Sequence, residues 1–277
     1  MNSSIINAVF VSDIHAGCKL GLCPESITLD EGGTYHASAA QNSVREIWDY
    51  AWDTWVPMAT RGEPYVVIFN GDAIDGSHHN STHQITHNLT KQVDIAYEML
   101  APRREKADLW YHIKGTEAHV GQSGADEEAL ACRLGAEIND VGQYARYELD
   151  VMIGDALVHA THHIGSTSST SLETNALSKE LGGMFSEAGR WGYRPPDVVV
   201  RGHRHRHSLI SLPTGNGTAI CVTLPGWQLK TPFCYKGQFR ITTPHFGLVA
   251  LRVESQPVCQ SYIKGIERPS PVIPVQK

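Results

Sequence analysis

The sequence predicts an α/β fold in which buried strands alternate with amphipathic helices. Five apolar runs, each too short to form a helix, lie between residues 5 and 200, and segments with helical apolar spacing lie among them. Asp or His side chains follow each run within a few residues. Because ligands in open α/β sheets bind at the carboxyl ends of the strands, these polar side chains are expected to share one site.

The first predicted strand covers residues 5–11 and leads into Asp13 and His15. Residues two apart in an extended chain point to the same side, so the two side chains are expected to face one point, where a single metal ion could bind both. A turn with a solvated carboxylate is the ordinary alternative for such a pair. The same pattern at four further strand ends favours the metal.

The other four strands are predicted at residues 65–69, 109–113, 156–160 and 197–200. The polar residues that follow them are, in chain order, Asp72 and Asp75, then Thr116, Glu117 and His119, then His162 and His163, and finally His203 and His205. All five strand ends therefore supply side chains that can bind a metal.

Three helices are predicted from apolar spacing. Residues 38–58 place Trp48, Trp52 and Trp55 on one face, and three tryptophans on one face are more often core than a platform for stacking bases. A second helix begins near Leu89 and is expected to stop at Pro102. A third covers apolar positions from 177 to 188, and its Gly182-Gly183 pair is a candidate interruption.

Less regular segments connect these elements. Residues 17–33 are expected to form a long loop beside the site, as a lid or substrate wall. A hairpin is predicted over residues 144–163, with its turn at 154–155. Beyond residue 205 we expect strands at 208–212, 218–224, 245–254 and 258–263 without helices, then an extended tail, 266–277. No linker is visible, so residues 1–277 are predicted to form a single domain.

Three histidines, His79, His83 and His87, are spaced four residues apart. On a helix they would share a face and could bind a metal by themselves. No fourth ligand is evident, so a position at the mouth of a cleft is the preferred interpretation. His79 is the candidate among them for contacting substrate.

Composition is that of an ordinary globular protein, with 277 residues, 41% hydrophobic and 19% charged. The formal charge of −6 weighs against binding long nucleic acid by general electrostatics. No leader or apolar run of transmembrane length is visible, so a cytoplasmic protein without membrane contact is expected. The six cysteines, including Cys18 and Cys23 near the first motif, lack paired zinc-type spacing and are expected to be reduced thiols.

The ordered set of motifs resembles the calcineurin-like metallophosphoesterase superfamily. In chain order the set is Asp-x-His at Asp13, Gly-Asp-x-x-Asp at Asp72, Gly-x-x-x-His at His119, His at His162 and Gly-His-x-His at His203. The Gly-Thr-x-x-His and Gly-His-Arg-His-Arg-His forms are similar to those of short bacteriophage members. The resemblance implies a four-layer α/β/β/α sandwich, with two mixed β-sheets flanked by helices and two divalent metal ions at the strand ends.

The resemblance also implies a role for each matching residue. Asp13, His15 and His205 would bind one metal, His162 and His203 would bind the other, and Asp72 would bridge both. His163 is the alternative to His162. Carboxylates and imidazoles without a thiolate suit Mn, Fe, Zn or Co.

Three nearby residues have supporting roles on the same interpretation. Gly71 and Gly202 would let the backbone pass close to the ions. Asp75 would orient a ligand or cap the next helix.

The third motif departs from the family's Gly-Asn-His pattern. Thr116 stands where the Asn would bind the second metal, and the histidine that would contact the phosphate or protonate the leaving group comes two residues late, as His119. Thr116, Glu117 or His119 could complete the second metal site, so the general acid stays open. His119 and Asp72 are the catalytic candidates, and Thr116 and His79 the substrate-binding ones.

The function implied is hydrolysis of a P–O ester by hydroxide bound to two metals, which clamp the attacking and leaving oxygens. Arg204 is expected to point away from the metals if its stretch is extended, and few other cations surround the site. Sites for monoesters usually add cationic donors, so a phosphodiesterase acting on a small, nucleotide-type ester is predicted, with a phosphomonoesterase as the alternative.

Two interpretations compete with an active phosphoesterase. One is a catalytically silent scaffold of the same fold, against which the retained ligand positions argue. The other is a metal-dependent amidohydrolase, whose His-x-His comes early in a barrel, whereas here it comes late and precedes a β-rich segment. The sequence predicts no oligomeric state.

Overall fold

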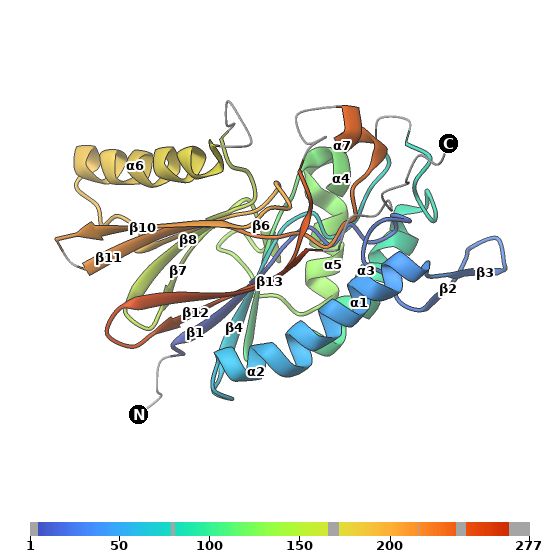
Figure 1. The fold of residues 1–277 in the computed structure, drawn as a ribbon, viewed down its shortest axis with the longest axis horizontal. Coiled ribbons are helices and arrows are strands. Elements are labelled where there is room, and N and C mark those ends of the chain that lie inside the picture. The colour runs from blue at the N-terminus through green and yellow to red at the C-terminus, as the bar shows by residue number, and fades with distance from the viewer. Residues whose placement is uncertain (1–4, 79–80, 166–171, 216, 237–241, 266–277) are drawn as a thin grey trace, which may run out of the picture.

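The computed structural model describes residues 5–78, 81–165, 172–215, 217–236 and 242–265 (Figure 1). Its six-stranded sheet has the order β13 (Pro257–Gly265), β12 (His245–Val253), β1 (Asn7–Val11), β4 (Tyr65–Asn70), β5 (Leu109–Ile113) and β6 (Ala145–Arg146). Its five-stranded sheet has the order β10 (Ser208–Thr214), β11 (Gly217–Thr223), β9 (Val198–Arg201), β8 (Ala156–Thr161) and β7 (Glu148–Ile153). A hairpin of β2 (Ser26–Thr28) and β3 (Thr34–His36) belongs to neither sheet.

The central strands of each sheet are parallel, and antiparallel strands flank them. β1, β4, β5 and β6 run parallel, whereas β12 and β13 are antiparallel to their neighbours. In the second sheet β8, β9 and β11 run parallel, and β7 and β10 are antiparallel. All five strands predicted to precede the motifs are confirmed, with ends within two residues of those expected. The motifs therefore follow the carboxyl ends of strands.

Alternate residues of β1 enter two different cores. Val9 and Val11 pack toward helices, whereas Ala8 and Phe10 pack toward the second sheet. Helices α1 (Ala39–Tyr50), α3 (Leu89–Arg104) and α5 (Ala125–Arg133) cover the first sheet, and α6 (Glu173–Trp191) covers the second (Figure 1). The predicted four-layer α/β/β/α sandwich is confirmed. Strands buried on both faces need no polar alternation, which explains their continuous apolar runs.

The predicted helix over residues 38–58 is three consecutive pieces. α1 is followed by a π-helical segment, η1 (Ala51–Trp55), and by α2 (Val56–Ala59). The Ser38 side chain caps α1 by accepting a hydrogen bond from the backbone N–H of Gln41. Trp48 and Trp52 are buried in the core beside the six-stranded sheet, as predicted.

The predicted stop of the next helix at Pro102 is wrong. α3 continues through Pro102 to Arg104. A proline in the last turn removes a single backbone hydrogen bond, and the buried Leu100 and Arg103 hold that turn against the core. In α6 the Gly182-Gly183 pair causes no interruption, because these exposed glycines lie opposite the buried face that carries Leu177 and Leu181.

Several connecting segments differ from expectation. Residues 17–33 are not wholly loop, since they contain β2 and lead into β3. The chain after residue 205 has the predicted β-rich character but also a short helix, α7 (Pro232–Lys236). In the predicted hairpin, β7 pairs with β8, but β6 pairs with β5 in the other sheet. The single domain stays a prediction, and the tail lies outside the described residues.

The three spaced histidines do not form a helical face. α3 begins only at Leu89, with Asn88 as its cap, so His83 and His87 precede the helix. His79 lies outside the described residues. Among the helices that the structure describes, none combines the length and apolar character needed to cross a bilayer.

Candidate metal centre

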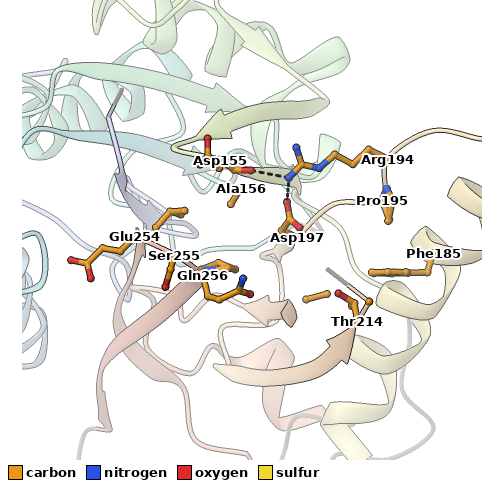
Figure 2. A pocket seen from close by; sticks show the side chains of 14 residues that line it. Asp155, Ala156, Phe185, Arg194, Pro195, Asp197, Thr214, Glu254, Ser255 and Gln256 are labelled. Carbon is orange, nitrogen blue, oxygen red and sulfur yellow. Dashed lines mark hydrogen bonds and ion pairs between the residues drawn. The ribbon is translucent and has the colours of Figure 1, made fainter. Parts of the chain in front are cut away.

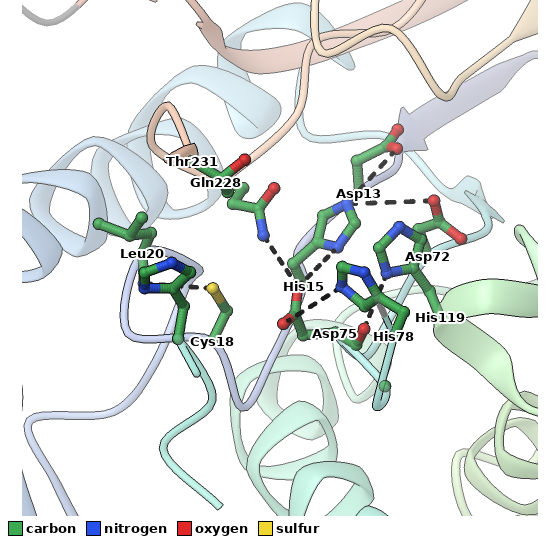
Figure 3. Close-up of polar contacts among 12 residues, drawn as sticks. Asp13, His15, Cys18, Leu20, Asp72, Asp75, His78, His119, Gln228 and Thr231 are labelled. Atoms are coloured by element: carbon green, nitrogen blue, oxygen red, sulfur yellow. Dashed lines mark hydrogen bonds and ion pairs between the residues drawn. The ribbon is translucent and has the colours of Figure 1, made fainter. Parts of the chain in front are cut away.

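The six predicted metal ligands come together at one edge of the two sheets. Loops after β1, β4, β8 and β9 carry them, and Figure 3 shows Asp13, His15 and Asp72 converging from separate segments. Their ligand atoms form overlapping groups within 4.8 Å, namely Asp13, His15 and His205; Asp13, Asp72 and His162; and His162, His163 and His203. The structure thus brings together side chains that are up to 192 positions apart, from Asp13 to His205.

The first group surrounds a point suited to one ion. His205 Nε2 lies 3.1 Å from His15 Nε2 and 3.3 Å from Asp13 Oδ1, and His15 Nε2 lies 3.9 Å from Asp13 Oδ1. Ligands about 2.1 Å from one ion are separated by about 3.0–3.4 Å at tetrahedral or octahedral angles. Asp13 Oδ1 is buried and has no hydrogen-bond partner among the described residues. A cation bound to these atoms would satisfy that oxygen.

Asp72 lies between the first group and the second. Its Oδ2 is 3.1 Å from His162 Nε2 and 4.0 Å from His15 Nε2. The other ring nitrogen of His162, Nδ1, donates to the backbone carbonyl of Asn70 at 2.6 Å, which turns Nε2 toward Asp72. This arrangement suits a carboxylate that bridges two ions.

Two further side chains could complete the second group. Thr116 Oγ1 lies 3.3 Å from Asp72 Oδ2 and 3.2 Å from His203 Nδ1. The exposed His163 has its ring centroid 5.1 Å from that of His162 and 5.0 Å from that of His203. His162 faces Asp72 directly, whereas His163 reaches the group from the solvent side. His162 and His163 can therefore both serve as ligands of the second group, and the choice of one does not exclude the other.

The backbone conformation that directs these side chains toward one another differs from the extended chain that was expected. Asp13 and His15 follow β1 with φ of 57° and 45°, so they are not in extended chain. Asp72, His203 and His205 also have positive φ, at 56°, 71° and 51°. Such values are uncommon outside glycine and typically mark functional sites whose surroundings hold the strain. Left-handed turns, and not strand alternation, aim these side chains.

Two glycines permit the close approach of these loops. A Cβ at Gly71, whose φ is +88°, would lie 2.6 Å from His162 Nδ1. A Cβ at Gly202 would lie 2.5 Å from Ser12 Oγ and 3.1 Å from His162 Nδ1. Any larger residue would therefore displace the His162 ring.

The carboxylates and one histidine stabilise one another's charges. Burial alone would raise the pKa of Asp13, but His205 and His162 lower it to about 2. Burial likewise opposes ionisation of Asp72, yet the charge of His162 holds its pKa well below the usual range. For His162, burial lowers the pKa, but Asp72 and Asp13 raise it to about 10. The charged His162 ring therefore offsets the negative charge of the two carboxylates.

Asp75 orients His15 rather than capping a helix. Its carboxylate accepts hydrogen bonds from Gln84 Nε2 at 2.8 Å and Gln228 Nε2 at 3.0 Å, and its Oδ1 lies 3.5 Å from His15 Nδ1. The capping alternative is wrong, because Asn88 caps α3. A carboxylate on the far ring nitrogen fixes the orientation of a ligating imidazole.

His119 also lies against this site. It belongs to the short helix α4 (Glu117–Val120), its Nδ1 donates to the backbone carbonyl of Asp75 at 2.8 Å, and its ring packs edge-on against His15 with centroids 4.6 Å apart. Burial and the charge of His15 lower the pKa of His119 to about 4. The neutral ring therefore presents an Nε2 lone pair. Its ligand atoms group with those of His15 and Asp72.

A cavity of about 510 Å³ opens over the site. His15, Asp72, His119, His203 and His205 line its floor, and residues 228–234 form a wall. Thr116 lines it too, whereas Glu117 is exposed and is not among the described lining residues. Cys18 lines the cavity as a thiol, since burial raises its pKa to about 12.

The surroundings of the site are more cationic than expected. Arg204, Arg206 and Lys230 all line the cavity. The stretch around Arg204 is bent, not extended, and the guanidinium donates to the backbone carbonyl of Gly165. Arg206 is held by the Glu173 carboxylate, with Nε 2.5 Å from Oε1. Arg204 was expected to point away from the metals only if its stretch were extended; because the stretch is bent, that condition is not met, and Arg204 lines the cavity.

A second cavity, of about 450 Å³, contains none of the predicted site residues (Figure 2). Arg194 is held there by the Asp197 carboxylate and the carbonyl oxygen of Asp155, as the dashed lines in Figure 2 show. The charge of Arg194 is thus paired with a carboxylate of the same cavity.

Some residues of the site could not be found from sequence patterns. Asn70 acts through its backbone carbonyl, which any residue possesses. Gln228 lies 153 positions from Asp75, its partner. The buried Glu127 of α5 contacts the loops after β4 and β5. Its position inside an acidic helix start resembled a solvated face, so no signal distinguished it.

Neither a protein-family model nor a curated protein matches the chain. Solved structures with similar chain traces include Vps29 of Entamoeba histolytica, complexed with zinc, at 9% identity and TM-score 0.38, covering 93% of this chain and 99% of that one. The sulfate thiohydrolase SoxB of Thermus thermophilus has 9% identity and TM-score 0.42, covering 94% and 57%. A 5'-nucleotidase of Candida albicans has 11% identity and TM-score 0.38, covering 94% and 51%. Similarities this low establish no activity, so functional inference depends on the side chains.

Proposed function

We propose that the chain is a dinuclear-metal-dependent phosphoesterase of the calcineurin-like metallophosphoesterase superfamily. One observation carries this proposal: Asp72 lies between two groups of ligand atoms, 3.1 Å from His162 Nε2 and 4.0 Å from His15 Nε2. A shared carboxylate between two imidazole-containing groups is suited to a pair of divalent ions. A silent scaffold would have no need for the strained backbone that aims these ligands.

The ligand assignment follows the two groups. Asp13, His15 and His205 would hold one ion, His162 and His203 the other, and Asp72 both, with His163 or Thr116 available to the second. Carboxylates and imidazoles suit Mn, Fe, Zn or Co. Two such ions, when bound, would lower the pKa of a water and neutralise charge on the transferred phosphoryl group.

The chain's own residues would position the reactants. Asp75 fixes the ring of His15, and the carbonyl of Asn70 fixes that of His162. Thr116 Oγ1, which donates to Asp72 Oδ2 at 3.3 Å, would turn its hydroxyl toward a phosphate oxygen when substrate binds. His119 would contact the phosphate or an ion through Nε2, because its Nδ1 proton is already donated to Asp75. Protonation of the leaving group by His119 would require an imidazolium, which its pKa of about 4 disfavours.

The proposed substrate is a small phosphodiester of nucleotide type. The formal charge of −6 supports a small substrate over long nucleic acid. A phosphomonoesterase is the second candidate, and Arg204, Arg206 and Lys230 in the cavity favour it, because a monoester dianion carries more charge than a diester. The diester is preferred because Arg206 is already paired with the Glu173 carboxylate and Arg204 with the carbonyl of Gly165. A cytoplasmic location remains a prediction.

The test is hydrolysis of bis- and mono-(p-nitrophenyl) phosphate by the same Mn-loaded protein. We expect a higher kcat/KM for the diester. A monoester preference of tenfold or more, about 1.4 kcal/mol of transition-state discrimination, would overturn the diester assignment. A nitroanilide substrate tests the amidohydrolase interpretation, and absence of turnover on all three with two metals bound would indicate a scaffold.

A further inference from the structure

Glu127 is a fully buried carboxylate beneath the metal centre. It lies in the first turn of α5, and its exposed fraction is 0%. Oε1 accepts a hydrogen bond from the backbone N–H of Ala73 at 2.9 Å, and Oε2 accepts one from the N–H of Gly115 at 2.5 Å. One side chain therefore joins the loop after β4 to the loop after β5.

Both bonded N–H groups are next to residues of the site. Ala73 directly follows Asp72, and Gly115 directly precedes Thr116. The N–H of Thr116 in turn donates to Asp72 Oδ1 at 2.6 Å. Glu127 therefore holds the backbone of the residue after Asp72 and of the residue before Thr116. It reaches Asp72 Oδ1 indirectly, through the Gly115–Thr116 peptide link and the hydrogen bond donated by Thr116.

The contacts of Glu127 indicate why a carboxylate occupies this buried position. His112 Nε2 lies 3.8 Å from Oε1, and its ring stacks on Phe69 with centroids 4.7 Å apart. The two close contacts of the carboxylate are thus backbone N–H groups of the site loops. A buried carboxylate is costly to desolvate, and an apolar residue would fill the space with less penalty. What the carboxylate provides, and an apolar residue could not, is the fixed position of the loops after β4 and β5 relative to each other.

We propose that Glu127 is a positioning residue that fixes the left-handed turn at Asp72, whose φ is 56°, and so the spacing of the two metal sites. The inference rests on the proposed function, since it assumes that Asp72 binds ions. Glu127 touches neither substrate nor metal, and it acts through Ala73, Gly115 and Thr116.

The adjacent residue provides a matched control. Glu128 lies on the same helix and accepts hydrogen bonds from the backbone N–H groups of Tyr144 and Ala145, each at 2.8 Å. It makes the same kind of two-bond contact, but it holds the start of β6 instead of the site loops. If the mere loss of hydrogen bonds between α5 and a loop were responsible for an effect, substitution of Glu127 and substitution of Glu128 should have the same effect.

The experiment compares Glu127→Gln with Glu128→Gln. A glutamine oxygen can accept only one of the two N–H groups, and its amide N–H would oppose the other. We measure Mn²⁺ affinity by calorimetry, Tm without metal, and kcat and KM. Glu127→Gln should weaken binding of one Mn²⁺ at least tenfold and lower kcat with KM nearly unchanged. Glu128→Gln should lower Tm yet leave Mn²⁺ affinity within about twofold.

Other results would contradict either the positioning role of Glu127 or the metal centre itself. Equal effects of the two variants on Mn²⁺ affinity, or an unchanged affinity in Glu127→Gln, would overturn the positioning role. If Glu127→Gln does not fold, Glu127→Asp keeps the charge but is too short to span both N–H groups, and the same loss of affinity is expected. Failure of the unsubstituted protein to bind two Mn²⁺ would instead refute the metal centre itself.

Discussion

Metal binding should expel a proton from His162, so affinity should depend steeply on pH. The His162 ring donates from Nδ1 to Asn70, and its Nε2 faces Asp72 Oδ2 at 3.1 Å. Burial lowers its pKa, but Asp72 and Asp13 raise it from the model-peptide value of 6.5 to about 10. The ring is therefore protonated in the metal-free protein at neutral pH, whereas a metal requires the neutral ring.

The size of the effect follows from this shift. At pH 7 the pKa of about 10 lies about three units above the solution pH. At about 1.36 kcal/mol per unit, removal of the proton costs about 4 kcal/mol, and this cost falls as the pH rises. Apparent affinity for the second ion should therefore increase about tenfold per pH unit between pH 7 and 8.5. With an ordinary histidine pKa, affinity would instead level off above about pH 7.5.

Calorimetric titration with Mn²⁺ in two buffers of different ionisation enthalpy measures the released protons directly. At pH 8 about one proton should be released, with His162 as its source. His203 and His119 should release none, because burial and neighbouring histidines lower their pKa values to about 4. Mn²⁺ binding that releases no proton, with an affinity that does not change between pH 7 and 8.5, would refute the reasoning.

Four further outcomes are expected. Without metal, the stabilisation from the raised pKa of His162 is complete below pH 6.5 and is lost as the pH rises through about 10, so urea midpoints should fall over that range. Asp72→Asn should reduce turnover more than any other single ligand change; near-normal turnover with both metals retained would exclude a bridging role. His119→Ala should slow hydrolysis by removing the Nε2 contact, and loss of one metal equivalent would assign that contact to an ion, unchanged metal content to the phosphate; selective slowing of esters with poor leaving groups would contradict the neutral ring and make His119 the proton donor. A chelator should abolish turnover, and Mn²⁺ should restore it; activity that survives chelation would contradict metal dependence.

The sequence by itself determined the strands and the residues at their ends. Strands buried on both faces must be apolar throughout, so β1 and β4 appear as uninterrupted runs, and the polar residues that follow them stand out. Helical spacing located Trp48 and Trp52 in the core. These features are local, since each follows from the burial of one segment.

Only the tertiary structure decided how the side chains converge. Asp13 and Asp72 are aimed by left-handed turns, whose φ values depend on contacts with neighbouring loops and leave no pattern in the residues themselves. The role of Glu127 depends on two backbone N–H groups that are 12 and 54 positions away. The cationic wall of the cavity likewise arises from a bend at Arg204 and a segment near Lys230 that no spacing connects. Long-range packing sets these contacts, and a pattern of residue types records only what each segment buries.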